Sequence, residues 1–353
     1  GESAFEFCNL ANGLKYIDNY VEGDEHPGLS IGYRAFYASG LSKELVLHSF
    51  ITSIGEYAFA RCEGLINSPI TIYAQDIDQY AFAECKTLNG QILIYSNNIY
   101  FHAFDKTTIG TLIIDTKYDH DSPSASYHVH NQAFYGIKFT GQVLIRDHVV
   151  IDDFAFIYST FGTHLIIDAD SIGKYAFTFC DSSNNCNVSI GETSIKEHAF
   201  EYFGRQRTAI TLEFHTKTEP RALNTIGAAA FNTTGFSNHL VIPRYYTGVG
   251  REAFANCQRI KSASINFGQT LQPGTLSSPN IGDSSFEGSG LTELSITSNG
   301  LPVSIGDRAF YGLGINHIMI MPFTLTSVGS SAFQDCTSLR GVVFDHNTPG
   351  LTY

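Results

Sequence analysis

Histidine and aspartate are concentrated in one segment, Lys117–His130, which contains His120, His128, His130 and two aspartates. Imidazole nitrogens and carboxylate oxygens together can hold a divalent metal ion such as zinc. Val129, however, occupies a repeated apolar position described below, so His128 and His130 on either side of it should face the surface. We therefore expect solvated loop histidines here, and we predict no metal site and no cofactor.

Other residues with reactive or ligating side chains form no catalytic pattern. The acidic turn Glu22–Glu25 could bind calcium weakly, but so short a charge run is more often a solvated turn. The sequence contains no Cys-x-x-Cys pair, no Gly-x-Ser-x-Gly elbow, no His-Glu-x-x-His pair and no phosphate-binding Gly-x-x-x-x-Gly-Lys loop. We therefore predict that the protein is not an enzyme.

The elements that position these side chains are copies of one short unit, represented by Ile54–Cys62. An Ala-Phe or Ser-Phe pair closes each of fourteen copies, and Ile or Val stands five residues before the Phe in every copy after the first. The Phe residues are Phe5, Phe36, Phe59, Phe82, Phe104, Phe134, Phe156, Phe177, Phe200, Phe231, Phe254, Phe286, Phe310 and Phe333. Successive Phe residues are 21 to 24 positions apart in nine cases and 30 to 32 in four. A fixed period in this range indicates a solenoid of stacked coils.

We interpret residues 1–353 as a single repeat domain of about 14 units with a period of about 23 residues, four of them with inserts. The inserts are predicted at Asp18–His26, Lys117–His130, His215–Asn224 and Phe267–Asn280. The chain starts inside a unit and ends after a strand-like run, so we expect it to be a fragment of a longer protein.

A short alternating apolar run follows most of the motif Phe residues, as in Ile70–Ile72, Ile92–Ile94 and Leu112–Ile114. Period two and β-branched content predict strands whose first and third residues face the core and whose middle residue faces outward. Stacked coils would place these strands about 4.8 Å apart in one long parallel sheet. The motif Phe rings would then form an internal ladder behind it.

Between the strands, apolar residues stand five and one positions before the Phe, at the Phe itself and three positions after it. This spacing fits one face of a short helical turn. The Ala before the Phe is replaced only by Ser285, as expected where adjacent coils approach closely. Gly follows the motif Ile in nine of fourteen copies, so a positive φ is not required there.

Six of the seven cysteines stand three residues after a motif Phe. They are Cys8, Cys62, Cys85, Cys180, Cys257 and Cys336. Buried cysteine behaves as a small apolar side chain, so we expect core positions. Cys186 is off this pattern, and a disulfide between Cys180 and Cys186 could close a small loop.

Composition limits the kinds of partner. Hydrophobic residues make up 43% of the chain, which is enough for a continuous core, while the formal net charge is -13 and Lys and Arg are scattered. Such a charge distribution makes nucleic acid an unsuitable partner. Because no apolar run of about 18 residues is present, we also predict no membrane insertion. We expect a monomer.

The pattern Ile-Gly-x-x-Ala-Phe-x-x-Cys-x-x-Leu, as in Ile54–Leu65 and Ile77–Leu88, resembles the BspA-like class of leucine-rich repeats over essentially the whole chain. The Pro that often follows the strand in that family is present at Pro243 and Pro322 and is missing from most copies. The resemblance implies a right-handed, curved leucine-rich repeat solenoid. Its one long parallel β-sheet would line the concave face, with short helical turns or irregular segments on the other side.

The resemblance also implies a function and a location. Proteins of this kind are displayed at the cell surface or secreted, and they bind other proteins. The expected partner is a host matrix protein, a host-cell protein or a surface protein of a neighbouring cell.

The outward middle residues of the strands are the candidate ligand-binding residues on the concave face. Leu93, Ile113, Leu144 and Ile166 make four consecutive apolar rungs, with tyrosines beside them. An exposed apolar stripe with aromatic edges is typical of a protein-binding patch, although aliphatic residues also favour strands for their own sake. The predicted site is Tyr73, Leu93, Tyr95, Ile113, Leu144 and Ile166. A spacer array without a ligand and a carbohydrate-binding module with Tyr73 and Tyr95 as platforms remain alternatives.

Overall fold

The computed structural model describes residues 1–10, 28–65, 67, 69–116, 127–183, 185–207, 209–216, 224–268 and 279–344. The insert Asp18–His26 with its acidic turn lies outside these residues, as do the central parts of the other three inserts. The chain divides into two compact units, Gly1–Asp170 and Ser171–Tyr353, and each is described by itself. The single domain inferred from the sequence stays a prediction.

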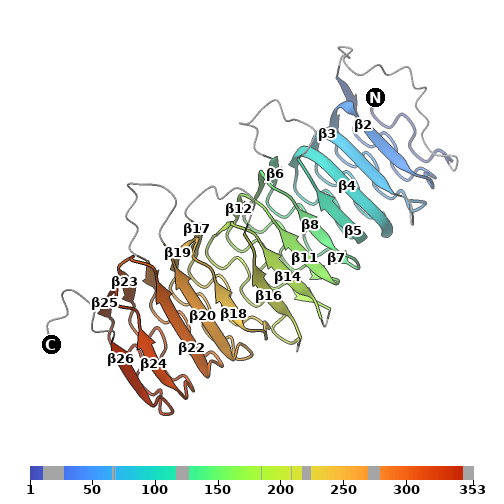
Figure 1. The fold of residues 1–353 in the computed structure, drawn as a ribbon. Coiled ribbons are helices and arrows are strands. Elements are labelled where there is room, and N and C mark those ends of the chain that lie inside the picture. Colours follow the sequence, from blue (N-terminus) through green and yellow to red (C-terminus); the bar gives the residue numbers. More distant parts are fainter. Residues whose placement is uncertain are drawn as a thin grey trace. The chain divides into compact units, whose positions relative to one another are not determined.

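The first unit is a parallel β-solenoid (Figure 1). Its strands are β1 (Leu29–Ile31), β2 (Leu45–Ile54), β3 (Ile70–Ile77), β4 (Thr87–Ile99), β5 (Thr108–Ile114), β6 (Tyr127–Val129), β7 (Lys138–Phe139), β8 (Val143–Ile145), β9 (Val149–Ile151), β10 (Thr160–Phe161) and β11 (His164–Ile167). Successive coils pair in register, so that Ile70 lies beside Ile92 and Ile92 beside Leu112. The predicted parallel sheet is therefore confirmed in this unit.

The second unit repeats the same arrangement. Its strands are β12 (Ser171–Ile172), β13 (Asp181–Ser182), β14 (Asn187–Ile190), β15 (Ser194–Ile195), β16 (Thr211–Phe214), β17 (Asn224–Ile226), β18 (Leu240–Ile242), β19 (Tyr246–Val249), β20 (Ser262–Phe267), β21 (Asn280–Ile281), β22 (Glu293–Ser298), β23 (Val303–Ile305), β24 (Ile318–Met321), β25 (Leu325–Val328) and β26 (Gly341–Phe344). Strand β20 was not among the runs identified from the sequence, because its first residues are Ser, Ala and Ser. It pairs in parallel with β18 and β22.

Each coil contributes a second strand segment that the sequence pattern does not reveal. It ends at the motif Ile or Val, and these residues pair from coil to coil, as in Ile54 with Ile77 and Ile77 with Ile99. The motif Ile was expected at the start of a helical turn. It is instead the last residue of a strand, buried with 0% exposure at Ile54.

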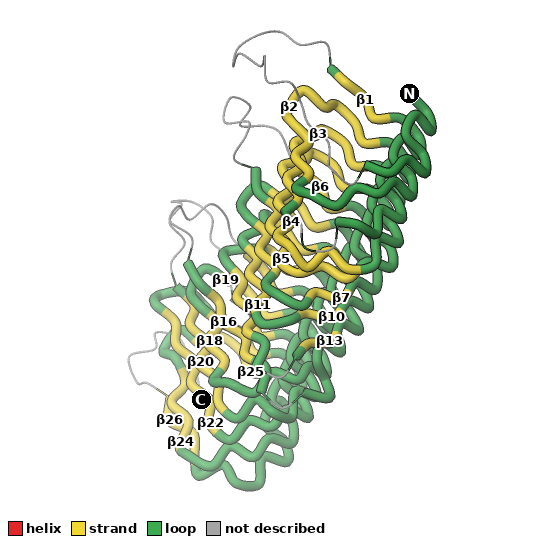
Figure 2. The backbone as a smooth tube through the Cα atoms, turned by 90° about the vertical axis from the view of Figure 1, so that its right-hand side faces the viewer, coloured by secondary structure: helices red, strands yellow, loops and turns green. Residues whose placement is uncertain are grey.

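The predicted helical turns are wrong, because the described residues contain no helix and the motif segments are chains of hydrogen-bonded turns (Figure 2). The amide of Ala58 bonds within its coil to Gly55 O, whereas the amide of Phe59 bonds to Ala81 O in the next coil at 2.8 Å. An α-helix would require every amide to bond within the segment. Amides that bond within the coil thus alternate with amides that bond to the next coil. The φ angles two residues before and after the Phe are positive, 57° at Tyr57 and 59° at Arg61. The left-handed conformation costs about 1–2 kcal/mol for each such residue, which the bonds between coils offset.

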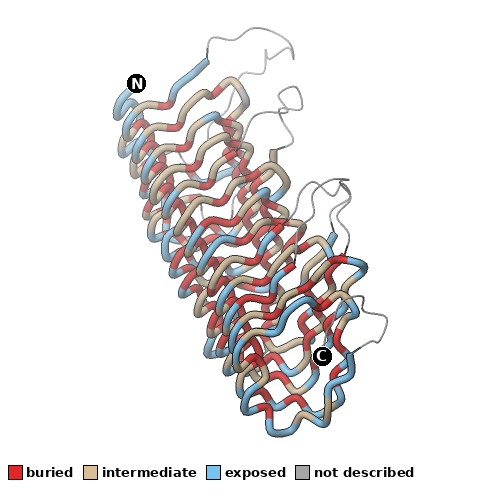
Figure 3. Tube along the Cα trace, turned by 90° about the vertical axis from the view of Figure 1, so that its left-hand side faces the viewer, coloured by how far each residue is buried: buried red, intermediate tan, exposed pale blue. Residues whose placement is uncertain are grey.

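The predicted internal ladder of Phe rings is confirmed within each unit. Successive rings stack nearly parallel, with centroids 5.1 Å apart between Phe59 and Phe82 and 4.8 Å between Phe177 and Phe200. These separations match the spacing of about 4.8 Å between paired strands. Buried residues recur at matching places in successive coils (Figure 3). Burying one Phe side chain contributes about 1.5–3 kcal/mol, so the ladder is the main apolar element of the core.

The Gly after the motif Ile is explained by close approach between coils. A Cβ added at Gly55 would lie 2.8 Å from Ile31 O, and one added at Gly250 would lie 2.5 Å from the Gly227 carbonyl carbon. Neither Gly has a positive φ. The prediction that positive φ is not required at this position is therefore confirmed.

The recurring cysteine position is buried at Cys62, Cys85, Cys180, Cys257 and Cys336, as expected, and exposed at Cys8, where the expectation is wrong. The position also has a polar role. The Cys85 thiol donates to Phe59 O of the preceding coil at 3.2 Å, and Ser159 Oγ in the same position donates to Phe134 O at 2.7 Å. Neither Cys180 nor Cys186 takes part in a disulfide, so the loop between them is not closed by one.

Thiol labelling tests the burial of these side chains. Burial raises the pKa of Cys62 and Cys257 to about 11 and that of Cys186 to about 12. At about pH 8 the thiolate fraction of such a group is about one in 1,000 or less, so these thiols should not react. Iodoacetamide followed by peptide mass spectrometry should label Cys8 in the native protein and all seven cysteines after denaturation without reductant. Failure of Cys180 and Cys186 to react in denaturant would contradict the free-thiol assignment.

Ser285 offers a test of how tightly the coils are matched. Its side chain has 0% exposure and its hydroxyl has no hydrogen-bond partner among the described residues. Because a buried unpaired hydroxyl is unfavourable, Ser285→Ala should raise the free energy of unfolding by about 1 kcal/mol in urea denaturation. The control Ser159→Ala removes a bonded hydroxyl at 2.7 Å and should lower it by about 1–3 kcal/mol. A loss of stability in S285A would show that the hydroxyl is satisfied.

Candidate functional site

The structure brings the four predicted apolar rungs together in one row. Leu93 on β4 pairs with Ile113 on β5, Ile113 with Leu144 on β8, and Leu144 with Ile166 on β11. These are the middle residues of the strands, and their neighbours Ile92 and Ile94 have 0% exposure. Leu144 is the most covered of the four at 9% exposure, while the other three are partly exposed. We call these four residues the apolar stripe.

The two predicted tyrosines lie on the same outward face, two residues further along their strands. Tyr73 pairs with Tyr95, and their rings stack with centroids 4.7 Å apart and planes 1° apart. Both are partly exposed. Burial raises the pKa of the Tyr95 hydroxyl above its ordinary value, and the neighbouring Tyr73 and Asp115 raise it further. We call Tyr73 and Tyr95 the tyrosine pair.

Polar residues continue the row of the tyrosine pair. The Asp115 amide bonds to Ile94 O, which places Asp115 next to Tyr95, and Arg146 and Asp168 follow in the next two coils in the same way. Arg146 is exposed and the two aspartates are partly exposed. The face therefore combines an apolar row with a row of aromatic and charged side chains.

The corresponding outward positions of the second unit are mixed: they are polar on β14, β16, β20 and β22, but apolar on β18, β24 and β26, where Val241, Ile320 and Val343 are 43%, 68% and 48% exposed. Ser189 on β14 pairs with Glu213 on β16, and Val241 on β18 pairs with Ser264 and, through it, with Ser295. Thr211 of β16 lies beside Asn187 in the same pair of strands. Polar side chains evidently suffice to form these strands.

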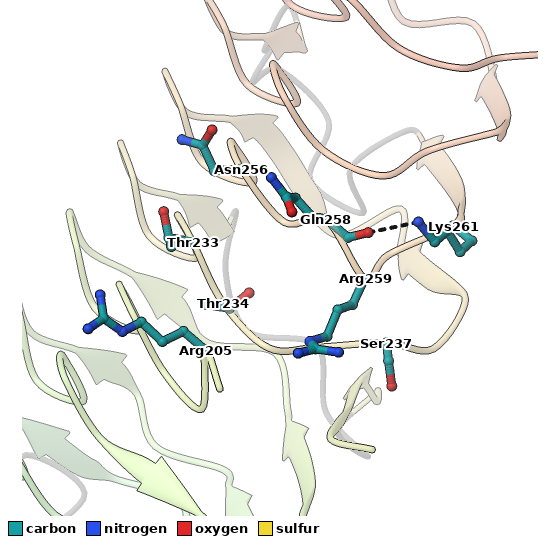
Figure 4. A pocket seen from close by; sticks show the side chains of 8 residues that line it. All are labelled: Arg205, Thr233, Thr234, Ser237, Asn256, Gln258, Arg259 and Lys261. Carbon is teal, nitrogen blue, oxygen red and sulfur yellow. Dashed lines mark hydrogen bonds between the residues drawn. The ribbon is translucent and has the colours of Figure 1, made fainter. Parts of the chain in front are cut away.

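The second unit also contains a polar hollow of about 660 Å³ (Figure 4). Its lining includes three cationic side chains, Arg205, Arg259 and Lys261, together with hydroxyl and amide groups. Lys261 Nζ donates to Gln258 O at 2.9 Å, and the Arg205 guanidinium lies 5.5 Å from the centroid of the Tyr202 ring. The cationic side chains suit an anionic group, although two of the three, Arg205 and Lys261, are exposed.

His128 and His130 do not form the solvated loop expected from the sequence. Both belong to β6 or its end, and their side chains are about 30% exposed. His128 Nδ1 lies 3.2 Å from Asp152 Oδ1 and His130 Nδ1 lies 2.8 Å from Asp152 Oδ2. Burial is the largest single influence and raises the pKa of the Asp152 carboxyl. The hydrogen bonds from the two histidines lower it, and the net result is a pKa below the ordinary value. His120 lies outside the described residues.

Sequence reasoning missed this cluster although a signal was present. His130 and Asp152 both stand four residues before a motif Phe. Equal positions in successive units are neighbours in a solenoid, so their contact follows from the repeat.

Parallel coils, in-register strands and a buried aromatic ladder together define a leucine-rich repeat type of solenoid. The family described as the BspA type leucine rich repeat region matches residues 1–120, 119–217, 208–277 and 273–352. The chain belongs to this family, as the resemblance of its repeats indicated.

Two solved structures are similar to this chain. One is a leucine-rich repeat protein from Bacteroides ovatus, with 18% identity over 95% of this chain and 86% of that chain and a TM-score of 0.43. The other is a leucine rich cell surface protein from Faecalibacterium prausnitzii, with 17% identity over 90% of this chain and 83% of that chain and a TM-score of 0.29. No curated protein matches the chain.

The opposite orientation of adjacent residues on β4 can be tested by substitution. Leu93→Ser acts on a partly exposed side chain and should lower the free energy of unfolding by less than about 1 kcal/mol. Ile92→Ser places a hydroxyl at a position with 0% exposure and should lower it by about 3–5 kcal/mol. Urea denaturation followed by far-ultraviolet circular dichroism measures both. Equal losses would mean that the apolar stripe belongs to the core.

Proposed function

We propose that the chain is an extracellular or cell-surface interaction module that binds a protein through the apolar stripe and the tyrosine pair. The observation that carries the proposal is the row of four apolar outward residues across β4, β5, β8 and β11, of which Leu93, Ile113 and Ile166 are partly exposed. Membership of a leucine-rich repeat family supports an interaction role. The partner would be a host matrix protein, a host-cell protein or a surface protein of a neighbouring cell.

The dimensions of the face suit the centre of a protein interface. Four rungs about 4.8 Å apart give a stripe about 14 Å long, and the tyrosine pair with its charged neighbours adds a parallel row. Protein interfaces combine an apolar, aromatic centre with a polar rim and bury about 800 Å² on each partner. Asp115, Arg146 and Asp168 would belong to that rim.

A carbohydrate ligand is less well supported. Sugars bind to aromatic side chains by lying against an open ring face. Tyr73 and Tyr95 stack on each other, so one face of each ring is occupied. The other alternative, a spacer array without a ligand, predicts that the chain has no specific partner, and the binding measurement below distinguishes it from the interaction module.

The location is part of the proposal. The described residues include no helix that is both long and apolar enough to cross a membrane. A location outside the cell rests on the family and on the interaction role proposed here. In this role the face binds a partner and performs no catalysis.

The double variant Leu93→Asp/Ile113→Asp tests the proposal. Two adjacent carboxylates on the stripe would have to be desolvated on binding, so affinity for the partner should fall at least tenfold, which corresponds to about 1.4 kcal/mol or more. Immobilised full chain can be measured by biolayer interferometry against purified matrix proteins such as collagen and fibronectin. The circular dichroism spectrum should remain that of the unmodified chain.

Val241→Asp is the matched control. Val241 is also the middle residue of its strand and is 43% exposed, but it lies on β18 of the second unit. Binding to the same partner should be unchanged in this variant. Unchanged binding in L93D/I113D, or an equal loss in V241D, would refute the assignment of the binding face.

A further inference from the structure

Three potential ligands meet at one edge of the first unit. His128, His130 and Asp152 each offer one donor atom, and these atoms all lie within 4.8 Å of one another. They come from two successive coils, since β6 ends at Val129 and Asp152 directly follows β9. His128 pairs with Val150 and Val129 with Ile151, so the backbone register holds the three side chains together.

The hydrogen bonds around His130 determine which of its ring nitrogens bears hydrogen. Asn98 Nδ2 donates to Asp76 Oδ1 at 2.8 Å, so the Asn98 side-chain oxygen is the atom that faces His130 Nε2 at 3.0 Å. Because an amide oxygen only accepts, Nε2 of His130 must be the donor. In the neutral imidazole the other nitrogen, Nδ1, then carries a lone pair.

Nδ1 of His130 lies 2.8 Å from Asp152 Oδ2. A metal ion bound to this nitrogen would therefore also lie within reach of the Asp152 carboxylate, whose oxygens are metal ligands.

We propose that His128, His130 and Asp152 form a binding site for a divalent transition-metal ion of the zinc type. Two imidazole nitrogens and one carboxylate oxygen form a ligand set that suits zinc, with the fourth position left to water or to an oxygen or nitrogen atom of a partner. Bonds of about 2.0–2.1 Å in a tetrahedron separate neighbouring ligand atoms by about 3.3 Å. The nitrogen to oxygen distance of 3.2 Å at His128 is close to that value, and the distance of 2.8 Å at His130 would lengthen by about 0.5 Å on metal binding.

The surroundings of His130 resemble those of a positioned metal ligand. A ligating histidine usually donates its other ring N–H to an oxygen, which fixes its tautomer and orientation. Asn98 accepts that hydrogen bond and is itself held by Asp76. The Tyr100 ring stacks on the His130 ring with centroids 4.7 Å apart. The imidazole is therefore held in place by contacts with the preceding coil.

The position of these residues in the repeat gives independent support. His130 and Asp152 occupy the place after the motif Ile where nine of fourteen units have Gly, and where a side chain at Gly55 would collide with the neighbouring coil. Asp78, Tyr100, His130 and Asp152 replace Gly in four consecutive coils and form a polar column there, whereas Lys196 replaces it in a coil between two coils with Gly. The cluster lies within that column and beside His128.

Metal binding to the full chain, prepared without a histidine tag, tests the proposal. After incubation with zinc and gel filtration, elemental analysis should find one zinc ion per chain, and zinc should raise the midpoint of thermal unfolding. Cobalt should give the visible absorption bands of a tetrahedral ion. Asp152→Asn and His130→Asn should each weaken zinc affinity at least tenfold, and Asn98→Leu should weaken it about 10- to 100-fold by loosening His130.

His198→Asn is the matched control. His198 also contacts a carboxylate, with its Nδ1 2.8 Å from Glu201 Oε2, but the pair includes no second histidine. Its substitution should leave zinc affinity and stoichiometry unchanged. Circular dichroism identifies any variant that fails to fold, and N98L then still reports on the site because it removes no ligand. No zinc uptake by the unmodified chain, or unchanged uptake by a folded His128→Asn/His130→Asn variant, would overturn the proposal.

Discussion

The contact between successive coils is the interaction on which the structure depends. In most coils the amide of the motif Phe donates to a backbone carbonyl of the next coil, as Phe36 does to Ala58 at 2.8 Å, and the Phe rings stack at 5.0 Å between the same coils. Neither interaction can form in an isolated coil. The stability of each coil therefore depends on its interfaces with the coils on either side, as in other repeat proteins.

Because the coils stack in register, the equivalent surface residues of successive coils form rows. A side chain at a given position of the repeat has neighbours of the same position at about 4.8 Å on either side. In this way single residues become the apolar stripe, the tyrosine pair and the polar column of Asp78, Tyr100, His130 and Asp152. The core positions are constrained by fit, as the close approach at Gly55 shows, whereas outward positions are free to differ between the units. We therefore expect functional residues at outward positions whose residue type differs from that at the same position in other coils.

The sequence could predict the ladder and the outward row because both follow from period alone. The row of Leu93, Ile113, Leu144 and Ile166 needs only strands in register. Helical turns were expected because apolar spacing of four, one and three residues suits a helix face, but the same spacing also suits turns whose alternate amides bond to the next coil. The decisive factor, a carbonyl group at hydrogen-bonding distance in the neighbouring coil, is invisible within one repeat. The register of β16 also depends on the neighbouring coil, because β14 places Glu213 rather than Thr211 beside Ser189.

The histidine cluster illustrates a more general consequence of this architecture. His128 and Asp152 are 24 residues apart in the chain, yet their side chains lie at hydrogen-bonding distance because the two residues belong to successive coils. Reading residue spacing along the chain, as for zinc fingers or Cys-x-x-Cys pairs, cannot find such a site. Aligning the units and reading down each position finds it at once: Asp76, Asn98 and His128 form one column, and Tyr100, His130 and Asp152 form the adjacent one. Asp78, Tyr100, His130 and Asp152 replace Gly in four consecutive coils, so the stacking gathers several donor atoms at one place, and a set of donors is what a metal ion requires.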